Sequence, residues 1–432
     1  MKVLVIGSGG REHALCWKLR QSPALTELYC APGNPGIASV ADLVQVAPEE
    51  IHELAGFASA MGIDLTVVGP ELPLNLGLVD EFQARGLRVF GPRKAAAELE
   101  GSKVFAKEFF ARHGIPTAEF VVAHDRPEAE RAAAAFGLPV VLKADGLAAG
   151  KGVVIAQSAE QVAEALDLFF GERRFGTAGD RIVIERHLTG EEVSFFALAD
   201  GARLLPLATA RDYKRLLDDD RGPNTGGMGS HSPSGLLTAE QGADILETIL
   251  YPTLAGLAEE NRAFTGVLYA GLMLTEEGPK VLEYNTRFGD PECQALMLRL
   301  EDDLLPILAA GAAGNFGISR LHFRKEASAV IVLASEGYPD KPERGDPIEG
   351  LEAAGQHPNV VVFHAGTAER EGQVVAAGGR VLGVAATGVE LADALRSAYA
   401  ATQEISWQAM RYRKDIGRRL LSRLEPGLGA RA

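Results

Sequence analysis

Short apolar runs alternate with amphipathic stretches over residues 1–90 of the chain. The runs at 2–6, 64–68 and 88–90 are dominated by Val, Leu and other apolar residues, as strands of a buried sheet are. Between them, 11–21 and 75–85 have the periodicity of helices. Strands that alternate with helices are typical of a parallel sheet flanked by helices, so the pattern predicts an α/β unit in this region.

The pattern changes after Gly91-Pro92, which marks a boundary. A long helical segment follows at 94–113, with an interruption near Gly101-Ser102. After it, shorter strands and helices indicate an α+β unit. The strands predicted here are 119–122, 140–144, 153–156 and 181–185, and the predicted helices are 126–136 and 159–170.

A hairpin and a long polar segment come next. Residues 193–199 and 203–207 are predicted strands joined across Asp200-Gly201. Residues 211–235 are polar and glycine-rich, and a loop of this length inside a compact domain is usually functional or disordered. Further on, we predict a helix at 238–260, strands at 268–274 and 280–285, and helices after Pro291 and at 302–312. A last unit at 326–425 has predicted strands at 329–334, 360–363 and 381–386 and a helix at 390–402.

Composition narrows the class of protein. With 47% hydrophobic and 23% charged residues among 432, the chain has the composition of a soluble globular protein of several units. The net charge of −15 argues against a nucleic acid or an anionic membrane as partner. Cys16, Cys30 and Cys293 have no metal-binding spacing, and with no signal-peptide pattern and no apolar run of 18 residues we expect a cytoplasmic protein.

The strand at 280–285 carries the most informative side chains. Glu283 and Asn285 are two residues apart, so alternation places their oxygens on one face, which Arg287 continues. A carboxylate and an amide oxygen side by side suit Mg²⁺ held jointly with nucleotide phosphates. An adjacent cation suits a transferred phosphoryl group or a substrate carboxylate. The alternative is an edge strand with solvated polar residues.

Glycine-rich segments supply two candidate anion sites. The loop at 7–13 opens a helix and resembles a dinucleotide-binding fingerprint, but Glu12 stands where the third glycine belongs. A small phosphate site assisted by Arg11, or a turn that binds nothing, fits better. The segment at 142–152 has the wrong spacing for a P-loop, yet its glycines with Lys143 and Lys151 suit a polyphosphate flap. The alternative for the two lysines is a solvated surface.

Two further segments are candidates for nucleotide and substrate contacts. The backbone at 185–188 is a candidate for pairing with the edge of a purine, and Glu192 is a candidate for binding ribose hydroxyls. A strand–turn–strand that binds no ligand fits the pattern equally well. The segment that begins at Arg211 and ends in glycines at 222–230 could close over a ligand. A disordered surface insertion is its alternative.

Taken in order, these segments resemble the ATP-grasp superfamily over essentially the whole chain. The motifs that carry the resemblance are GSGGREHAL at 7–15, GPELPL at 69–74, GSKVFAK at 101–107, LKADGLAAGKGV at 142–153, PNTGGMGS at 223–230 and RFGDPECQ at 287–294. The resemblance implies an α/β and α+β multidomain protein. We expect a Rossmann-like preATP-grasp domain at 1–100, an ATP-grasp domain at 101–325 with a lid at about 118–188, and an α+β domain at 326–432.

The resemblance also implies roles for matching residues. The ATP contacts are expected from Lys103, Lys143, Asp145, Gly146, Gly150, Lys151, Gly152, Glu185, Arg186, Leu188 and Glu192. The substrate contacts are expected from Gly9, Gly10, Arg11, Glu71, Asn224, Thr225, Gly226, Gly227, Arg287 and Asp290. Glu283 and Asn285 would bind Mg²⁺ or Mn²⁺, and the expected catalytic residues are Arg287, Asp212 and Lys143.

The implied activity is ATP-dependent ligation of glycine to 5-phosphoribosylamine through an acyl phosphate, by a monomer or weak dimer acting on small molecules only. One departure from the family concerns metal binding. Gly271 lies where many ATP-grasp enzymes have a first glutamate ligand, so a second metal ion is held differently or is absent. The alternatives are another ATP-grasp ligase or carboxylase acting on a ribonucleotide, and a nucleotide-binding regulatory protein without activity. Intact Glu283, Asn285 and Arg287 argue against the second.

Overall fold

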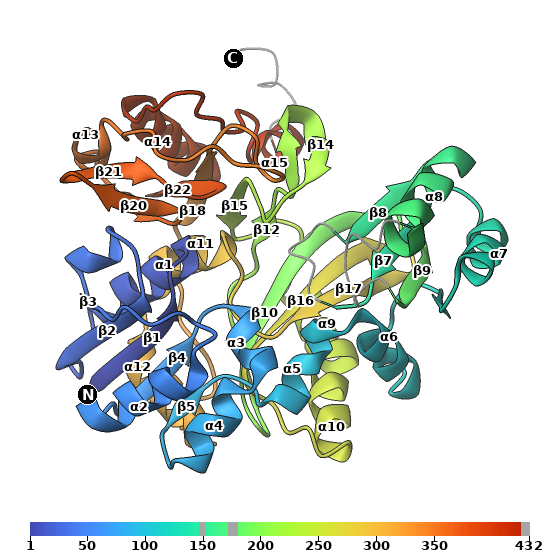
Figure 1. Ribbon diagram of the computed structural model, residues 1–432, viewed down its shortest axis with the longest axis horizontal. Coiled ribbons are helices and arrows are strands. Elements are labelled where there is room, and N and C mark those ends of the chain that lie inside the picture. The colour runs from blue at the N-terminus through green and yellow to red at the C-terminus, as the bar shows by residue number, and fades with distance from the viewer. Residues whose placement is uncertain (147–151, 172–179, 425–432) are drawn as a thin grey trace.

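The computed structural model describes residues 1–146, 152–171 and 180–424 (Figure 1). Its first unit is a five-stranded parallel sheet in the order β3-β2-β1-β4-β5. The strands are β1 Lys2–Gly7, β2 Glu27–Pro32, β3 Asp42–Leu43, β4 Leu65–Val68 and β5 Val89–Phe90. The helices are α1 Gly10–Leu19, α2 Ile51–Met61, α3 Glu71–Leu76 and α4 Leu78–Ala84. This is the predicted α/β unit, with a Rossmann-like strand order.

Two details of this unit differ from the sequence prediction. The helix expected at 75–85 is divided between α3 and α4 at Gly77, whose φ of +98° suits glycine and ends the first helix. The strands β2 and β3 and the helix α2 were not predicted. The order places the loops after β1 and β4 side by side at the carboxyl ends of the strands, where such sheets bind ligands.

An outer sheet and a central sheet follow. The outer sheet has the order β6-β9-β7-β8 and is covered by α7 and α8; the central sheet has the order β11-β10-β16-β17. Outer elements are β6 Phe120–Ala123, α7 Arg126–Phe136, β7 Val140–Ala144, β8 Val153–Ala156, α8 Ala159–Leu166 and β9 Ile182–Arg186. Central strands are β10 Glu191–Asp200, β11 Leu204–Pro206, β16 Thr265–Thr275 and β17 Gly278–Asn285. These confirm the predicted strands, including the hairpin at 193–207.

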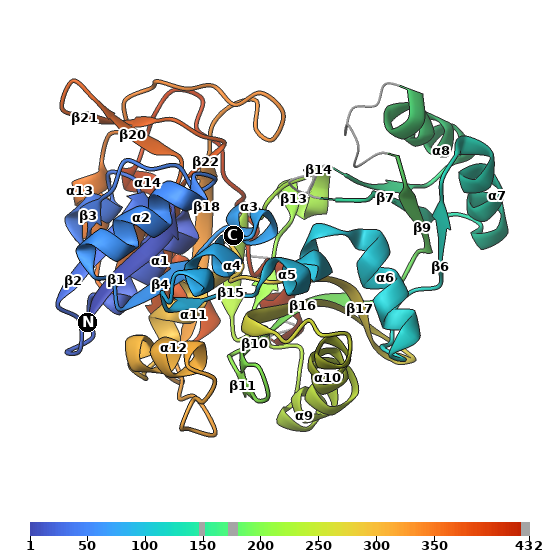
Figure 2. The same cartoon turned by 60° about the horizontal axis from the view of Figure 1, so that its bottom comes forward.

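Helices pack on the central sheet through a shared apolar core that includes Leu99, Phe109, Phe195 and Leu254. The predicted segment at 94–113 is two helices, broken at Ser102, whose hydroxyl caps the second by accepting from Phe105 N. The four helices that pack on the central sheet are α5 Lys94–Gly101, α6 Lys103–Arg112, α9 Ala239–Ile245 and α10 Tyr251–Glu259. In Figures 1 and 2 the outer sheet projects away from the N-terminal sheet and has its own apolar core.

The polar segment at 211–235 is not a structureless loop, so that prediction was wrong. It contains β12 Arg211–Asp212, β13 Arg215–Leu217, β14 Arg221–Asn224 and β15 Gly229–Ser232. β15 pairs with β18 Ala327–Ala334, far away in the sequence, and Ser230 and Ser232 are buried there. Because the partner strand is distant, the polar sequence gave no local signal of pairing.

The last unit is the sheet β12-β15-β18-β22-β19, on which α14 packs. Its remaining elements are β19 Val360–His364, β22 Arg380–Gly388, α13 Leu351–Gly355, α14 Leu391–Glu404 and α15 Arg418–Leu424. The predicted strands and helix are confirmed, and a hairpin of β20 Thr367–Arg370 and β21 Gln373–Ala376 was not predicted.

Two helices join the units. α11 Glu292–Arg299 is buried along its whole length, and α12 Leu304–Ala312 follows it. One apolar core includes Val5 of β1, Phe196 of β10, Leu296 of α11 and Val330 of β18, so α11 lies where the three units meet. Within the described residues, no helix combines the length and apolar character needed to cross a membrane.

Candidate active site

The carboxyl end of β17 carries Glu283 and Asn285, the two residues predicted to bind a metal ion. Glu283 and Asn285 pair with Gly271 and Tyr269 of β16, and the register shifts only beyond them, between Gly271 and Leu272. Their side chains therefore share one face, while Tyr284 is buried on the other. A Cβ at Gly271 would lie 3.5 Å from Glu283 Cγ. Gly271, the position at which many ATP-grasp enzymes have another glutamate ligand, therefore lies directly opposite Glu283.

Lysines from three segments converge on Glu283. Lys103 begins α6, Lys143 lies on β7, and Lys214 follows β12, with its Nζ 3.5 Å from Glu283 Oε1. Burial acts to raise the pKa of Glu283, but the charges of Lys214, Lys143 and Lys103 outweigh it and lower that pKa to about 2. The carboxylate is thus ionised and surrounded by more positive than negative charge, as a polyphosphate site requires.

Lys143 is held by a buried ion pair. Its Nζ donates to Leu282 O at 3.0 Å and lies 2.9 Å from Glu185 Oε1. Lys107 Nζ approaches the same oxygen at 3.2 Å, and burial lowers the pKa of Lys107 to about 8 although Glu185 opposes the shift. The Glu185 side chain therefore orients two lysines inside the protein.

The other expected ATP contacts are partly brought together. Glu185 pairs with a strand on each side, so free backbone begins only past Arg186, toward Leu188. Glu192 is half-exposed, with Oε2 3.5 Å from Lys214 Nζ. Lys103 Nζ donates to Gly146 O at 3.2 Å.

Asp145 has a different environment from the one expected of a phosphate-binding loop. Its Oδ1 accepts from Ser102 Oγ at 2.7 Å and Val104 N at 3.2 Å, which ties the outer sheet to the start of α6. Gly152 O accepts from Ala144 N at 2.8 Å. The expected contacts of Gly150 and Lys151 lie outside the described residues.

Arg287 lies between two glutamates. Its Nη2 is 2.9 Å from Glu100 Oε1, its Nε is 3.3 Å from Glu71 Oε2, and it donates to Asn285 Oδ1 at 3.1 Å. Burial acts to lower the pKa of Arg287, but the charges of Glu100 and Glu71 outweigh this effect, so the pKa is raised above its usual value. Arg287 is thus a permanently charged donor at the edge of the metal pair, and the expected substrate residue Glu71 faces it.

Asp212 is a buried carboxyl group next to this centre. Burial, reinforced by the charge of Glu292, raises its pKa well above the usual range. Among the described residues its Oδ1 has no hydrogen-bond partner. Glu292 accepts from Tyr269 Oη at 2.6 Å and Ser194 Oγ at 3.3 Å, so the two acids have different environments.

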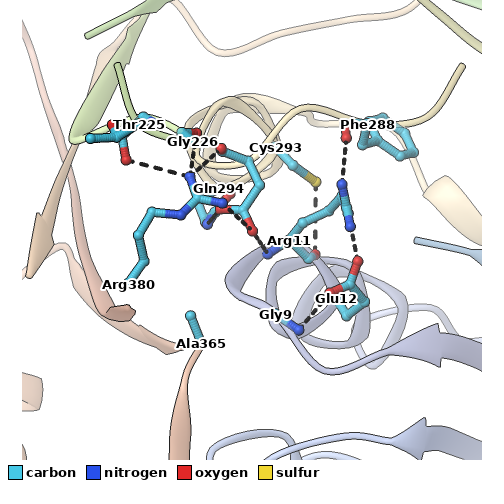
Figure 3. Close-up of polar contacts among 12 residues, drawn as sticks. Gly9, Arg11, Glu12, Thr225, Gly226, Phe288, Cys293, Gln294, Ala365 and Arg380 are labelled. Atoms are coloured by element: carbon cyan, nitrogen blue, oxygen red, sulfur yellow. Dashed lines mark hydrogen bonds and ion pairs between the residues drawn. The ribbon is translucent and has the colours of Figure 1, made fainter. Parts of the chain in front are cut away.

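The N-terminal loop is occupied by its own glutamate (Figure 3). Gly9 N donates to Glu12 Oε2 at 2.5 Å, and a Cβ at Gly69 would lie 2.0 Å from Glu12 Oε1. The glycines on both loops therefore make room for this carboxylate. Arg11 is buried, with Nη1 donating to Phe288 O at 3.1 Å. Its guanidinium faces the protein interior, whereas we had expected it at a phosphate.

The segment at 224–227 reaches the lysine cluster through Thr225. Thr225 Oγ1 donates to Lys214 O at 2.8 Å and accepts from Gly227 N at 3.0 Å. Asn224 pairs with Arg215 in the β13–β14 hairpin. Asp290 Oδ2 accepts from Arg11 N at 3.4 Å, next to Gly10. The structure thus links Thr225 and Gly227 to Lys214, and Asp290 to the N-terminal loop, whereas Asn224 contributes to a hairpin.

Family models match three successive parts of the chain: the N domain, the ATP-grasp (A) domain and the C domain of phosphoribosylglycinamide synthetase, at 1–100, 101–293 and 328–419. The chain belongs to the phosphoribosylglycinamide synthetase family. It is similar to the phosphoribosylamine–glycine ligase of Rhizobium meliloti, with 51% identity over 423 residues that cover 98% of this chain and 99% of the relative. The same enzyme of Brucella melitensis is 50% identical over the same shares.

Solved structures agree on the fold. The phosphoribosylamine–glycine ligase of Thermotoga maritima has a TM-score of 0.83 and 36% identity, covering 96% of this chain and all of that one (100%). The biotin carboxylase domain of the Hydrogenobacter thermophilus 2-oxoglutarate carboxylase, at 18% identity, has a TM-score of 0.74 over 100% of this chain and 99% of that one. The predicted fold class is confirmed, and the chain is an enzyme of this ATP-grasp ligase family.

Several site residues were not predicted from the sequence. Lys107 lies within a quoted motif, where its only individual signal is its helical spacing from Lys103, and Lys214 lies in the polar segment at 211–235 with no signal of its own. Glu100 precedes the interruption of a predicted helical segment, where a solvated glutamate is common, and Glu292 lies within the motif at 287–294 without a role assigned to it. Tyr338 and Arg380 lie in the C-terminal unit, where nothing in the sequence indicates contact with the site.

Proposed function

We propose that the enzyme joins glycine to 5-phosphoribosylamine, with ATP, to give glycinamide ribonucleotide, ADP and phosphate by way of glycyl phosphate, in de novo purine biosynthesis. The observation that carries this proposal is the convergence of Lys103, Lys143 and Lys214 on Glu283 beside Arg287. The names of the relatives supply the substrates. We infer that the chain works in the cytoplasm as a monomer or weak dimer, divided at about 100 and 325.

The donor set fits a divalent cation held jointly with phosphates. Glu283 and Asn285 offer one ionised carboxylate and one amide oxygen on a shared face, which suits Mg²⁺ or Mn²⁺ completed by phosphate oxygens and water. Among the described residues no group of three or more His, Cys, Asp or Glu is arranged to hold a metal ion, so phosphate oxygens and water would complete the coordination. Such an ion, when bound, neutralises charge on the phosphate oxygens.

In the first step a glycine carboxylate oxygen attacks the γ-phosphorus of ATP. The bond from that phosphorus to the bridging oxygen breaks, ADP leaves, and glycyl phosphate forms. Lys143, Lys103 and Arg287 stabilise charge on the phosphoryl oxygens by position and electrostatics. Buried ion pairs fix Lys143 and Arg287 before substrate binds, and Lys103 is held by its hydrogen bond to Gly146 O, so little reorganisation is needed.

In the second step the amine nitrogen of phosphoribosylamine attacks the acyl carbon. The carbon–oxygen bond to phosphate breaks, phosphate leaves, and the nitrogen gives up one proton. The departing phosphate takes up that proton, and we assign Asp212, whose Oδ1 has no hydrogen-bond partner among the described residues, to orienting the reacting groups. The acyl phosphate must be shielded from water, a role that suits the projecting outer sheet.

The amine substrate is assigned to the loops after β1 and β4. Gly9, Gly10 and Glu71 lie at the carboxyl ends of these neighbouring strands, where a parallel sheet binds ligands. Because Glu12 takes the Gly9 N–H group, other backbone donors of the loop must hold the phosphate.

Phosphate release measured while glycine and phosphoribosylamine are omitted in turn tests the proposal. Release should require ATP and glycine, and full turnover should require the amine as well. Turnover with another carboxylate in place of glycine, or with bicarbonate, would assign the chain to a different ATP-grasp reaction.

A further inference from the structure

The loop at 225–227 is enclosed between two units of the protein. On one side, a Cβ at Gly227 would lie 2.5 Å from Pro291 Cδ and 2.6 Å from Asp212 Oδ1. On the other, a Cβ at Gly226 would lie 3.0 Å from Arg380 Cζ, a residue of β22. Packing and a φ of +112° therefore require glycine at 227, whereas Gly226 faces the end of the Arg380 side chain.

Arg380 binds this loop and its neighbour at once (Figure 3). Its Nη1 donates to the carbonyl oxygens of Gly226 and Asp290, and approaches Gly227 O at 3.4 Å. Its Nη2 lies 3.4 Å from Asp290 Oδ2. A guanidinium fork is suited to several acceptors in one plane, which a lysine cannot match.

A second group from the C-terminal unit holds the same loop. Gly226 N donates to Tyr338 Oη at 2.9 Å. The Tyr338 ring lies over Gly379, where a Cβ would come within 2.2 Å of it, so the residue before Arg380 is also fixed by this contact. Tyr338 and Arg380 thus reach the loop together, one accepting from its N–H group and the other donating to its carbonyls.

The contacts of Arg380 lead in two directions. Through Gly227 and Thr225 they reach Lys214, which faces Glu283 in the phosphate site. Through Asp290 they reach the backbone of Arg11 on α1, beside the loop assigned to the amine substrate. Removing a guanidinium from water costs free energy that an apolar residue would not cost. The contribution of Arg380 is therefore the fixed position of its hydrogen-bond donors.

On the basis of the proposed function, we propose that Arg380 and Tyr338 are positioning residues that hold the loop at 225–227, to which we assign glycine, in register with the amine subsite. The C-terminal unit would then determine whether the acyl phosphate is captured by the amine. Without this alignment, glycyl phosphate would still form but would be hydrolysed, giving glycine and phosphate, before the amine attacks it.

The test compares Arg380→Met, Arg380→Lys and Tyr338→Phe with Arg411→Met, a matched arginine of the same unit that pairs with Glu336 on an exposed surface. For each full-length variant, KM is measured for ATP, glycine and phosphoribosylamine, and ADP formed is compared with glycinamide ribonucleotide formed. Thermal unfolding confirms that each variant is folded.

For Arg380→Met we expect KM for glycine and for the amine to rise roughly tenfold or more, as loss of a charge-assisted contact implies, with KM for ATP unchanged. ADP should exceed ligated product. Arg380→Lys should recover part of the coupling, and Tyr338→Phe should show a weaker form of the same pattern even if the arginine variants fail to fold. Arg411→Met should match the wild type.

Equal increases in all three KM values would reduce Arg380 to a structural residue and overturn the proposal. So would a folded variant with one ADP per product and unchanged KM values. A failure of the proposed function is distinguished because it would already appear in the wild type, as turnover that does not depend on glycine or on the amine.

Discussion

At the scale of single residues, the site is organised around a carboxylate that positive charge keeps ionised. Glu283 has a pKa near 2 because Lys214, Lys143 and Lys103 outweigh the effect of burial. Arg287 and Asn285 extend the same face. Each of these side chains is held by a protein partner, so replacing one changes the electrostatics of the others.

Replacement of Glu283 by Ala should lower turnover by orders of magnitude, because it removes the ionised ligand of the proposed metal pair. Turnover is measured as a function of Mg²⁺ concentration. Glu277→Ala, an exposed glutamate on the same hairpin, is the control. Near-normal turnover of the Glu283 variant at limiting Mg²⁺ would show that the carboxylate is not a ligand.

Lys143→Ala should raise KM for ATP roughly ten- to a hundredfold, because a charge-assisted contact to phosphate contributes about 1.5–3 kcal/mol. It should also lower turnover, since Glu185 then keeps only Lys107 as its cation. Steady-state kinetics with varied ATP provide the measurement, and Lys280→Ala, whose partner Glu277 is exposed, provides the control. An unchanged dependence on ATP would place Lys143 outside the nucleotide site.

At the scale of elements, short segments are shaped by what lies on either side of them. The helix α6 begins at Ser102 because that hydroxyl caps it, and Asp145 of the outer sheet joins the same helix start. The loop at 225–227 is shaped in the same way by Asp212, Pro291 and Arg380. The need for glycine in such a loop is set by residues that are distant in the sequence and pack against it in the folded protein.

Gly227→Ala should reduce kcat/KM for glycine and lower the free energy of unfolding by about 1–3 kcal/mol, because the new methyl group meets Pro291 and Asp212. Gly278→Ala separates this clash from backbone strain: its φ of +114° is close to the +112° of Gly227, but nothing lies within 4 Å of its Cβ. Denaturant unfolding and steady-state kinetics are measured for both variants, and we expect the larger losses in Gly227→Ala. Equal losses in the two would assign the effect to strain alone.

At the scale of the whole molecule, the N-terminal and C-terminal units share an apolar core and a contact between two histidines, of which His13 is buried and His364 is partly buried. His364 N donates to His13 Nδ1 at 2.8 Å across this junction. Burial lowers the pKa of His13 to about 3 and that of His364 to about 4. Both are therefore neutral in the folded protein at pH values where the unfolded chain would protonate them.

Between pH 6.5 and about 4 the unfolded state binds protons that the folded state does not, so stability should fall as the pH is lowered through this window. Each histidine contributes a slope of up to about 1.4 kcal/mol per pH unit. Urea unfolding of the wild type and His364→Asn between pH 4.5 and pH 7, roughly the window set by these pKa values, should show a shallower dependence for the variant. His124→Gln, at an exposed histidine of the outer sheet, is the control. An unchanged slope for His364→Asn would exclude the residue as a cause.

The sequence by itself determined much of the fold and the chemical character of the site. Periodicity identified most strands and helices because each buries one face or both, and that requirement is written locally in the chain. Alternation alone placed Glu283 and Asn285 on one face, as the register with β16 confirms. The resemblance to the ATP-grasp superfamily indicated that Gly271 stands where a first glutamate ligand is common, and Gly271 pairs with Glu283.

Tertiary structure decided which distant residues share the site. The pairing of β15 with β18 gives a polar segment its order, and only the packed units bring Lys214 to Glu283, Glu12 between two glycine loops and Arg380 to Gly226. No local pattern encodes these contacts, because each depends on a partner far away in the chain. The sequence therefore predicts the types of side chain that perform the chemistry, and packing between units determines where those side chains meet.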